Sequence, residues 1–132
     1  PAVEPEPRPT PRDPAEERLS FQATPRLADG VTVVEISGRI ILGEGTARLR
    51  QLLRDLLADG HRHILLNLAE VSYIDSSGIG ELVSGLAAVR SHGGELKLLH
   101  LNRRLRDLLQ LTRLYTVFDV HTDEEAALHS FR

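Results

Sequence analysis

The chain has 132 residues, of which 41% are hydrophobic, and its formal net charge is −3 at pH 7. This length accommodates one domain with a sizeable core, and the scattered basic residues argue against direct binding to nucleic acid or to anionic membranes. Cysteine is absent, which excludes disulfides and thiolate metal sites. The sequence has no apolar run of about 18 residues. It also has no apolar signal-peptide core near its start, so we expect no membrane insertion and a cytoplasmic location.

Residues 1–18 are rich in proline, glutamate and arginine. Proline lacks the N–H group that helices and sheets need, and few apolar groups here are available for burial, so we expect a disordered tail. Its composition favours a linker or leader over a ligand for a proline-binding domain. The folded domain is expected to span 19–132. Six of the seven prolines lie in the tail: Pro1, Pro5, Pro7, Pro9, Pro11 and Pro14.

A β-hairpin is predicted at the start of the domain. Residues 19–27 form the first predicted strand, and Pro25 within it indicates a position at the edge of the sheet. The pair Asp29-Gly30 is typical of a two-residue hairpin turn. The β-branched residues of 31–36 then form the second predicted strand.

A helix follows the hairpin. Gly38 breaks the strand pattern, Thr46 is the predicted N-cap, and the helix ends near Asp59, where Gly60 stops it. One apolar stripe at helical spacing indicates packing of this helix on a sheet, and it comprises Leu49, Leu52, Leu53, Leu56 and Leu57.

Strands and helices alternate through the rest of the chain, which implies parallel strands joined by right-handed crossovers. Together with the antiparallel hairpin, this predicts an α/β fold with a mixed, mostly parallel sheet and about four helices. The predicted elements are a central strand at 63–68, a helix through 79–90, a strand at 95–101, a helix capped by Asn102, a strand at 117–120 and a final helix opened by a capping box at 122–125.

The stretch 71–80 joins the central strand to the second of these helices, and it contains an aspartate, serines and glycines in close succession. Hydroxyl groups at such a junction lie at a helix N-terminus, where backbone N–H groups are unpaired and negative charge is favoured. This predicts a site for a phosphate group, either bound or covalently attached. Capping of the helix by Ser76 or Ser77 is the alternative interpretation, although Asp75 adds a carboxylate that a simple cap does not require.

Other chemical sites lack support in the sequence. The junction has neither the spacing of a P-loop nor the glycine array of a dinucleotide-binding loop, and it is not a hydrolase elbow. No catalytic set can be assembled, so we expect neither an enzyme nor a cofactor. The histidines include no pair at helical ligand spacing, so no metal site is expected among His61, His63, His92, His100, His121 and His129.

Several single residues have structural interpretations. We expect Tyr73 in the core, with its hydroxyl reaching the end of the strand, and we expect Asn67 to satisfy a nearby backbone group. The arginines of the third predicted helix form either a solvated face or part of a partner surface: Arg103, Arg104 and Arg106.

The sequence resembles the STAS domain family, and more narrowly the bacterial anti-sigma factor antagonists. Asn67-Leu68 followed by Val71-Ser72-Tyr73-Ile74-Asp75-Ser76-Ser77-Gly78-Ile79-Gly80 carries the likeness, which extends from about Val31 to the C-terminus. Two further stretches that carry it are Gly93-Gly94-Glu95-Leu96 and Leu111-Thr112-Arg113-Leu114.

The resemblance implies a partner switch. An anti-sigma factor that is also a serine protein kinase would phosphorylate Ser76, and a serine phosphatase would reverse the modification. The unmodified protein, a monomer or weak dimer, would bind the anti-sigma factor and so release sigma. Family members often place an acidic residue after the second strand, where this chain offers Glu44 in the loop 40–46. The implied partner-binding residues are Glu44, Asp75, Ser76, Ser77, Gly78 and Ile79.

A second interpretation also follows from the resemblance. The chain would then be a STAS scaffold subunit of a larger assembly, such as a stress-sensing complex or lipid-transport machinery.

Overall fold

The structure is a computed structural model, and it describes residues 20–132. The predicted disorder of 1–18 concerns residues outside this range. A five-stranded sheet has the order β1-β2-β3-β4-β5, with β1 antiparallel to β2 and the other neighbours parallel. The predicted mixed α/β sheet with four helices is therefore confirmed. The elements are β1 Gln22–Ala28, β2 Val31–Ile40, α2 Glu44–Ala58, β3 His63–Ile74, α3 Ser76–Ser91, β4 Glu95–Leu99, α4 Arg103–Leu111, β5 Val120–His121 and α5 Glu124–His129.

The predicted hairpin is present. Ala28 pairs with Val31, which leaves Asp29 and Gly30 as the two turn residues. Both have positive φ angles, 51° and 78°, as a type I′ turn requires. Pro25 lies within β1, at the edge of the sheet where a missing backbone donor is tolerated.

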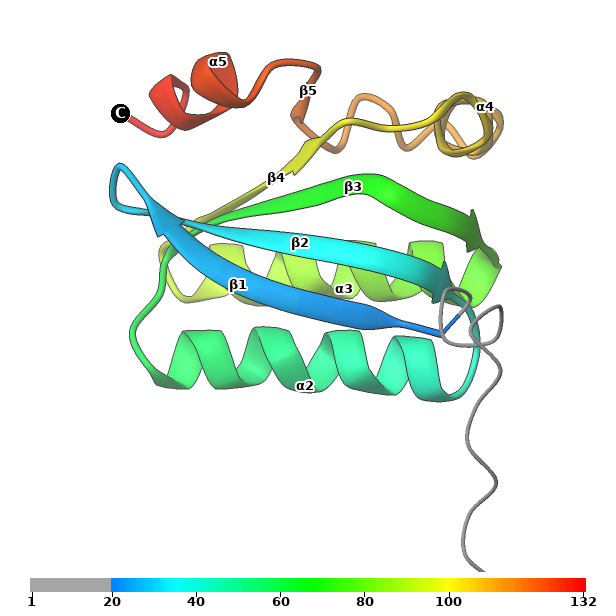
Figure 1. Cartoon of the computed structure of the whole chain (residues 1–132), viewed down its shortest axis with the longest axis horizontal. Helices are drawn as coiled ribbons and strands as arrows, with labels where there is room; N and C mark the ends of the chain where they lie inside the picture. The colour runs from blue at the N-terminus through cyan, green and yellow to red at the C-terminus, as the bar shows by residue number, and fades with distance from the viewer. Residues whose placement is uncertain (1–19) are drawn as a thin grey trace, which may run out of the picture.

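Helices cover both faces of the sheet. In Figure 1, α2 and α3 lie along one face, while α5 lies over the other. The leucines of α2 and α3 form one core cluster with Ile64, Leu66 and Leu68 of β3. A smaller cluster lies under α5, and it joins Val31, Val33, Leu65, Leu99, Ala127, Leu128 and Phe131.

Both central strands run further than the sequence pattern predicts. β2 continues through Gly38, which has a φ angle of 87°, as far as Ile40. β3 continues to Ile74 because two irregularities in its pairing with β2 admit two extra residues. Across these two irregular steps the buried residues of β3 are spaced by three, at Leu68, Val71 and Ile74.

The first helix begins two residues before the predicted N-cap. Gly43 is its N-cap, with a φ angle of 112°, and Thr46 is the third helical residue. The Thr46 hydroxyl accepts a hydrogen bond from the Gly43 N–H at 3.2 Å. The prediction of Thr46 as N-cap is therefore wrong by position, because glycine alone adopts the backbone angles needed at the helix start.

The last elements also differ slightly from the prediction. β4 ends at Leu99, and β5 is a two-residue strand that starts at Val120. Asn102 caps α4 as predicted, since its Oδ1 accepts the Leu105 N–H at 2.9 Å. Asp123, rather than Thr122, caps α5 by accepting the Ala126 N–H at 2.9 Å.

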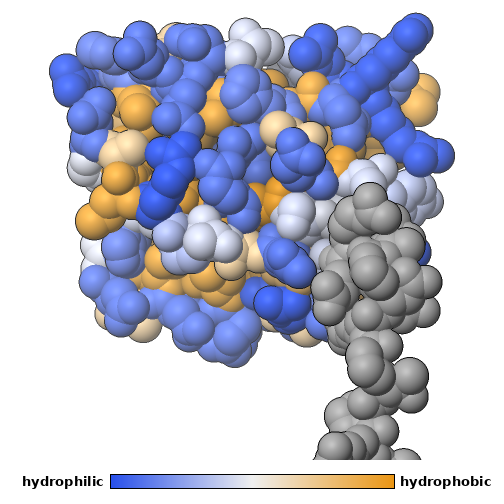
Figure 2. Space-filling model, viewed as in Figure 1, coloured by the Kyte–Doolittle hydropathy of each residue, from blue (hydrophilic) through white to orange (hydrophobic). Residues whose placement is uncertain are grey.

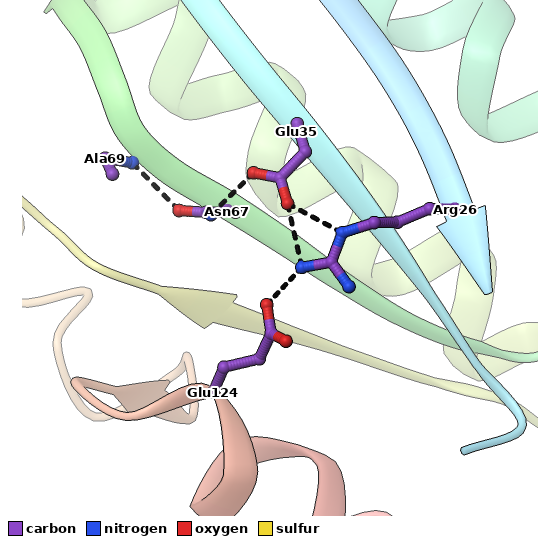
Figure 3. Close-up of polar contacts among 5 residues, drawn as sticks. All are labelled: Arg26, Glu35, Asn67, Ala69 and Glu124. Atoms are coloured by element: carbon purple, nitrogen blue, oxygen red, sulfur yellow. Dashed lines mark hydrogen bonds and ion pairs between the residues drawn. The ribbon is translucent and has the colours of Figure 1, made fainter. Parts of the chain in front are cut away.

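A polar cluster joins α5 to three strands on the face opposite α2 and α3 (Figure 3). Arg26 of β1 donates to Glu35 of β2 at 2.9 Å and to Glu124 of α5. Asn67 of β3 donates to the other Glu35 oxygen at 2.6 Å, and the Asn67 Oδ1 accepts the Ala69 N–H at 3.1 Å. The expected backbone role of Asn67 is thus present, together with a side-chain partner that the sequence did not indicate.

The surface mixes polar and apolar side chains. Figure 2 shows polar side chains over much of the viewed face, with smaller apolar areas between them. Across residues 20–132, none of the helices has the length and apolar character needed to cross a bilayer.

Candidate functional site

Residues 75–79, called here the Ser76 segment, lie at the carboxyl end of β3. The ends of β2 and β3 and the starts of α2 and α3 meet at this end of the sheet (Figure 1). The segment is the beginning of α3 rather than a separate turn, because Ser76 is already the first helical residue. Adjacent backbone elements therefore hold it in place.

Asp75 is the N-cap of α3. Its Oδ1 accepts the Gly78 N–H at 2.8 Å, and its backbone lies in the extended region that N-caps adopt. The alternative in which Ser76 or Ser77 caps the helix is therefore wrong. Because Asp75 caps the helix, the Ser76 hydroxyl is not needed as the cap and is available for other chemistry.

The second oxygen of Asp75 binds the loop between β2 and α2. Its Oδ2 accepts the Leu42 N–H at 3.0 Å, and the Asp75 N–H donates to the Ile40 carbonyl at 3.3 Å. The Leu42 N–H lowers the pKa of Asp75 most, partial burial opposes this, and the Gly78 N–H lowers the pKa further. Asp75 thus carries a negative charge that two elements of the fold stabilise.

The two serines differ in exposure. Ser76 is exposed, whereas Ser77 is half-buried. Backbone N–H groups of the first helical turn lack intrahelical acceptors, so negative charge at Ser76 is favoured by the helix. Of the two hydroxyls, that of Ser76 has the better access for a modifying enzyme.

Gly78 and Ile79 lie inside the protein. A Cβ built on Gly78 would lie 2.2 Å from the Ile40 carbonyl oxygen, and Ile79 is only 5% exposed within the main core. Their predicted contact with a partner stays a prediction. What the structure assigns to them is packing: they bring the start of α3 close to the end of β2.

Glu44 is the first residue of α2 and is exposed. Its Oε1 lies 3.5 Å from Arg48 Nη1 one helical turn later. The loop that precedes Glu44 reaches the Ser76 segment through the Leu42–Asp75 hydrogen bond, so the structure brings these two predicted regions together. Sequence reasoning missed Leu42 itself, an exposed apolar residue whose only signal was its place beside a glycine in a predicted loop.

Tyr73 is not in the core as predicted. It is 39% exposed, and the Arg104 guanidinium lies 4.9 Å from the centre of its ring. The bulged register of β3 turns Tyr73 away from the core, which Ile74 enters instead. Arg104 therefore packs on a tyrosine, and Arg103 and Arg106 are exposed as expected.

The histidines form no metal site within residues 20–132, where no group of three His, Cys, Asp or Glu side chains is placed to hold an ion. His61 Nδ1 lies 2.6 Å from the Thr32 hydroxyl, which gives it a structural partner.

Comparison with known proteins identifies the family. The sequence pattern of the STAS domain matches residues 22–127. The chain belongs to the STAS domain family. A relative from Bacillus subtilis (strain 168), the anti-sigma-B factor antagonist, is 34% identical over 95 residues, which cover 72% of this chain and 85% of the relative. The protein of the same description from Staphylococcus aureus (strain NCTC 8325 / PS 47) is 35% identical over 77 residues, covering 58% and 71%.

Solved structures share the STAS fold. The crystal structure of an anti-sigma factor antagonist from Mycobacterium paratuberculosis superposes with a TM-score of 0.73. It has 24% sequence identity and covers 86% of this chain and 95% of its own. The arrangement of sheet and helices is therefore that of a STAS domain, with the Ser76 segment at the carboxyl end of β3.

Proposed function

We propose that this STAS domain is an anti-sigma factor antagonist controlled by phosphorylation of Ser76. The unmodified chain binds an anti-sigma factor that is also a serine kinase, and sigma is released. Phosphorylation of Ser76 weakens this binding, and a serine phosphatase restores it. The names of the relatives from Bacillus subtilis and Staphylococcus aureus support the general role.

One observation carries the choice of Ser76. It is an exposed serine at the first position of α3, while Asp75 performs the capping that would otherwise occupy a hydroxyl. A phosphate here adds a charge of about −1.5 to −2 at neutral pH. The helix N-terminus tolerates that charge, so the fold stays intact when the serine is modified.

The same charge weakens a protein–protein contact. The phosphate lies beside the ionised Asp75, and a partner that covers both must remove water from two neighbouring negative groups. Each loss of about 1.4 kcal/mol in binding free energy lowers affinity tenfold. A modification that leaves the domain folded can therefore release the partner.

The experiment uses purified serine kinases of the anti-sigma factor class from the source organism. Each is incubated with ATP and wild type, Ser76→Ala or Ser77→Ala, and the phosphate is located by mass spectrometry. We expect transfer to wild type and Ser77→Ala but not to Ser76→Ala, and weaker kinase binding by Ser76→Asp than by wild type. Phosphate on Ser77 alone would overturn the assignment of the site.

The STAS scaffold alternative is tested by the same proteins. The native complex is isolated from the source cells and sized. If the chain binds membrane proteins stably and stoichiometrically, and Ser76→Asp does not affect this binding, the scaffold function would be supported and the switch rejected.

A further inference from the structure

Leu42 lies in the loop between β2 and α2 and exposes 76% of its surface to solvent. Exposed leucines are common on protein surfaces, so exposure alone assigns no role. Leu111 at the end of α4 is 82% exposed, for example. Leu42 differs from Leu111 in how its backbone is held and in which residue holds it.

The loop around Leu42 is fixed by hydrogen bonds on both sides. The Leu42 N–H donates to Asp75 Oδ2 at 3.0 Å, and the Gly43 N–H donates to the Thr46 hydroxyl at 3.2 Å. The Thr46 N–H in turn donates to the Ile41 carbonyl at 3.2 Å. An apolar side chain on a fixed loop loses little conformational entropy when a partner binds it, which is typical of anchor residues in interfaces.

Asp75 joins this loop to the proposed phosphorylation site. Its carboxylate holds the Leu42 backbone, and the next residue along the chain is Ser76. Leu42 is therefore joined to Asp75 by a hydrogen bond and Ser76 by the chain itself, and both residues are exposed. Glu44, the exposed first residue of α2, follows Leu42 by two residues.

We propose that Leu42 is the apolar anchor of the surface that Ser76 controls, and that the anti-sigma factor receives it in an apolar pocket. This inference rests on the proposed function and names the contact on which the switch acts. The pocket must lie beside a region of the partner that approaches Asp75 and Ser76 closely. Burial of Leu42 then requires removal of water from Ser76 and its neighbours.

This arrangement explains how phosphorylation acts without a change of fold. Water around an unmodified serine hydroxyl is displaced at little cost, whereas water around a phosphate is held strongly. The partner therefore cannot bury Leu42 without dehydrating the phosphate next to it. The modification opposes insertion of the anchor while the Leu42 loop stays in place.

The experiment measures binding of Leu42→Ala to the purified anti-sigma factor that binds wild type. Leu111→Ala is the matched control, because it removes the same side chain from a more exposed position in another part of the domain. We expect Leu42→Ala to weaken binding by about tenfold or more, and Leu111→Ala by less than about twofold. Leu42→Met, which keeps an apolar side chain of similar size, should retain most of the affinity.

A double variant tests the link to Ser76. If Leu42 and Ser76 share one contact, Leu42→Ala should weaken binding less in a Ser76→Asp background than in wild type. Equal losses for Leu42→Ala and Leu111→Ala, or full additivity with Ser76→Asp, would overturn the anchor and leave the proposed function standing. Failure of wild type to bind any purified anti-sigma factor would overturn both.

Discussion

Gly78 of α3 lies directly against the carbonyl of Ile40 at the end of β2, where a Cβ at position 78 would approach the oxygen to 2.2 Å. Ile40 and the Ser76 segment can come this close only because residue 78 has no side chain. The backbone of β2 cannot yield easily, since Ile40 is fully buried and its carbonyl also accepts the Asp75 N–H.

The first prediction follows from this contact. Gly78→Ala should lower the free energy of unfolding by about 2 kcal/mol or more, because the methyl group forces the start of α3 away from β2. Gly80→Ala is the matched control, since nothing lies within 4 Å of a Cβ there. It should be neutral or stabilising by up to about 1 kcal/mol, as alanine favours helix. Urea denaturation of both variants measures the difference, and equal stabilities would contradict the close contact.

The second prediction separates the cap from the serine beside it. Asp75→Ala removes acceptors for the Gly78 and Leu42 N–H groups and should lower the free energy of unfolding by about 1–2 kcal/mol. Ser76→Ala should change it by less than about 0.5 kcal/mol, because the serine does not cap the helix. Thermal unfolding followed by circular dichroism is sufficient. A larger loss of stability for Ser76→Ala than for Asp75→Ala would show that Ser76, rather than Asp75, caps the helix.

The third prediction concerns pH. The pKa of Asp75 in the folded protein lies below its ordinary value of 3.8, chiefly because the Leu42 N–H stabilises the carboxylate. A lowered folded-state pKa contributes stability above the unfolded pKa, and this stability is lost as pH falls through the folded pKa. Asp75→Asn keeps a good N-cap but carries no charge.

The test compares the unfolding free energies of wild type and Asp75→Asn across pH. Their difference should be largest near neutral pH and should shrink as pH falls below about 4. A difference that stays constant from neutral pH down to the acid limit of folding would show that the charge of Asp75 makes no contribution.

The fourth prediction concerns the attachment of α5. Arg26→Ala removes the ion pairs to Glu35 and Glu124, both at partly exposed positions. We expect a loss of about 1 kcal/mol or less, reduced further at high salt, because exposed ion pairs contribute little. Hydrogen exchange should increase most in α5, whose tie to β1 is cut. Uniformly faster exchange across the sheet would argue that Arg26 supports the whole fold instead.

The order of elements was predictable because it rests on local signals. The Asp29-Gly30 turn, the leucine stripe of α2 and the Asn102 cap each need only a few neighbouring residues to be recognised. The Ser76 segment was found in the same way, from its composition and from its resemblance to a family pattern.

The remaining features depend on contacts between distant residues. Two irregular steps in the pairing of β3 with β2 extend β3 to Ile74 and turn Tyr73 outward. No local sequence pattern in β3 predicts these two steps. Asp75 and the two serines are all good N-caps, so sequence alone leaves the choice open. The Leu42 N–H, 33 positions away along the chain, gives Asp75 a second hydrogen-bond partner and so favours Asp75 as the N-cap.

The Asp29–Gly30 turn offers a place to attach a probe. β2 has ten residues, and at about 3.3 Å per residue it places this turn about 30 Å from Ile40 and from the Ser76 segment that contacts Ile40. Exposed hairpin turns tolerate inserted peptides well. Because the chain has no cysteine, one cysteine in such an insert would carry a dye at a single position. The dye would report on binding at the opposite end of the sheet without occupying the surface it observes.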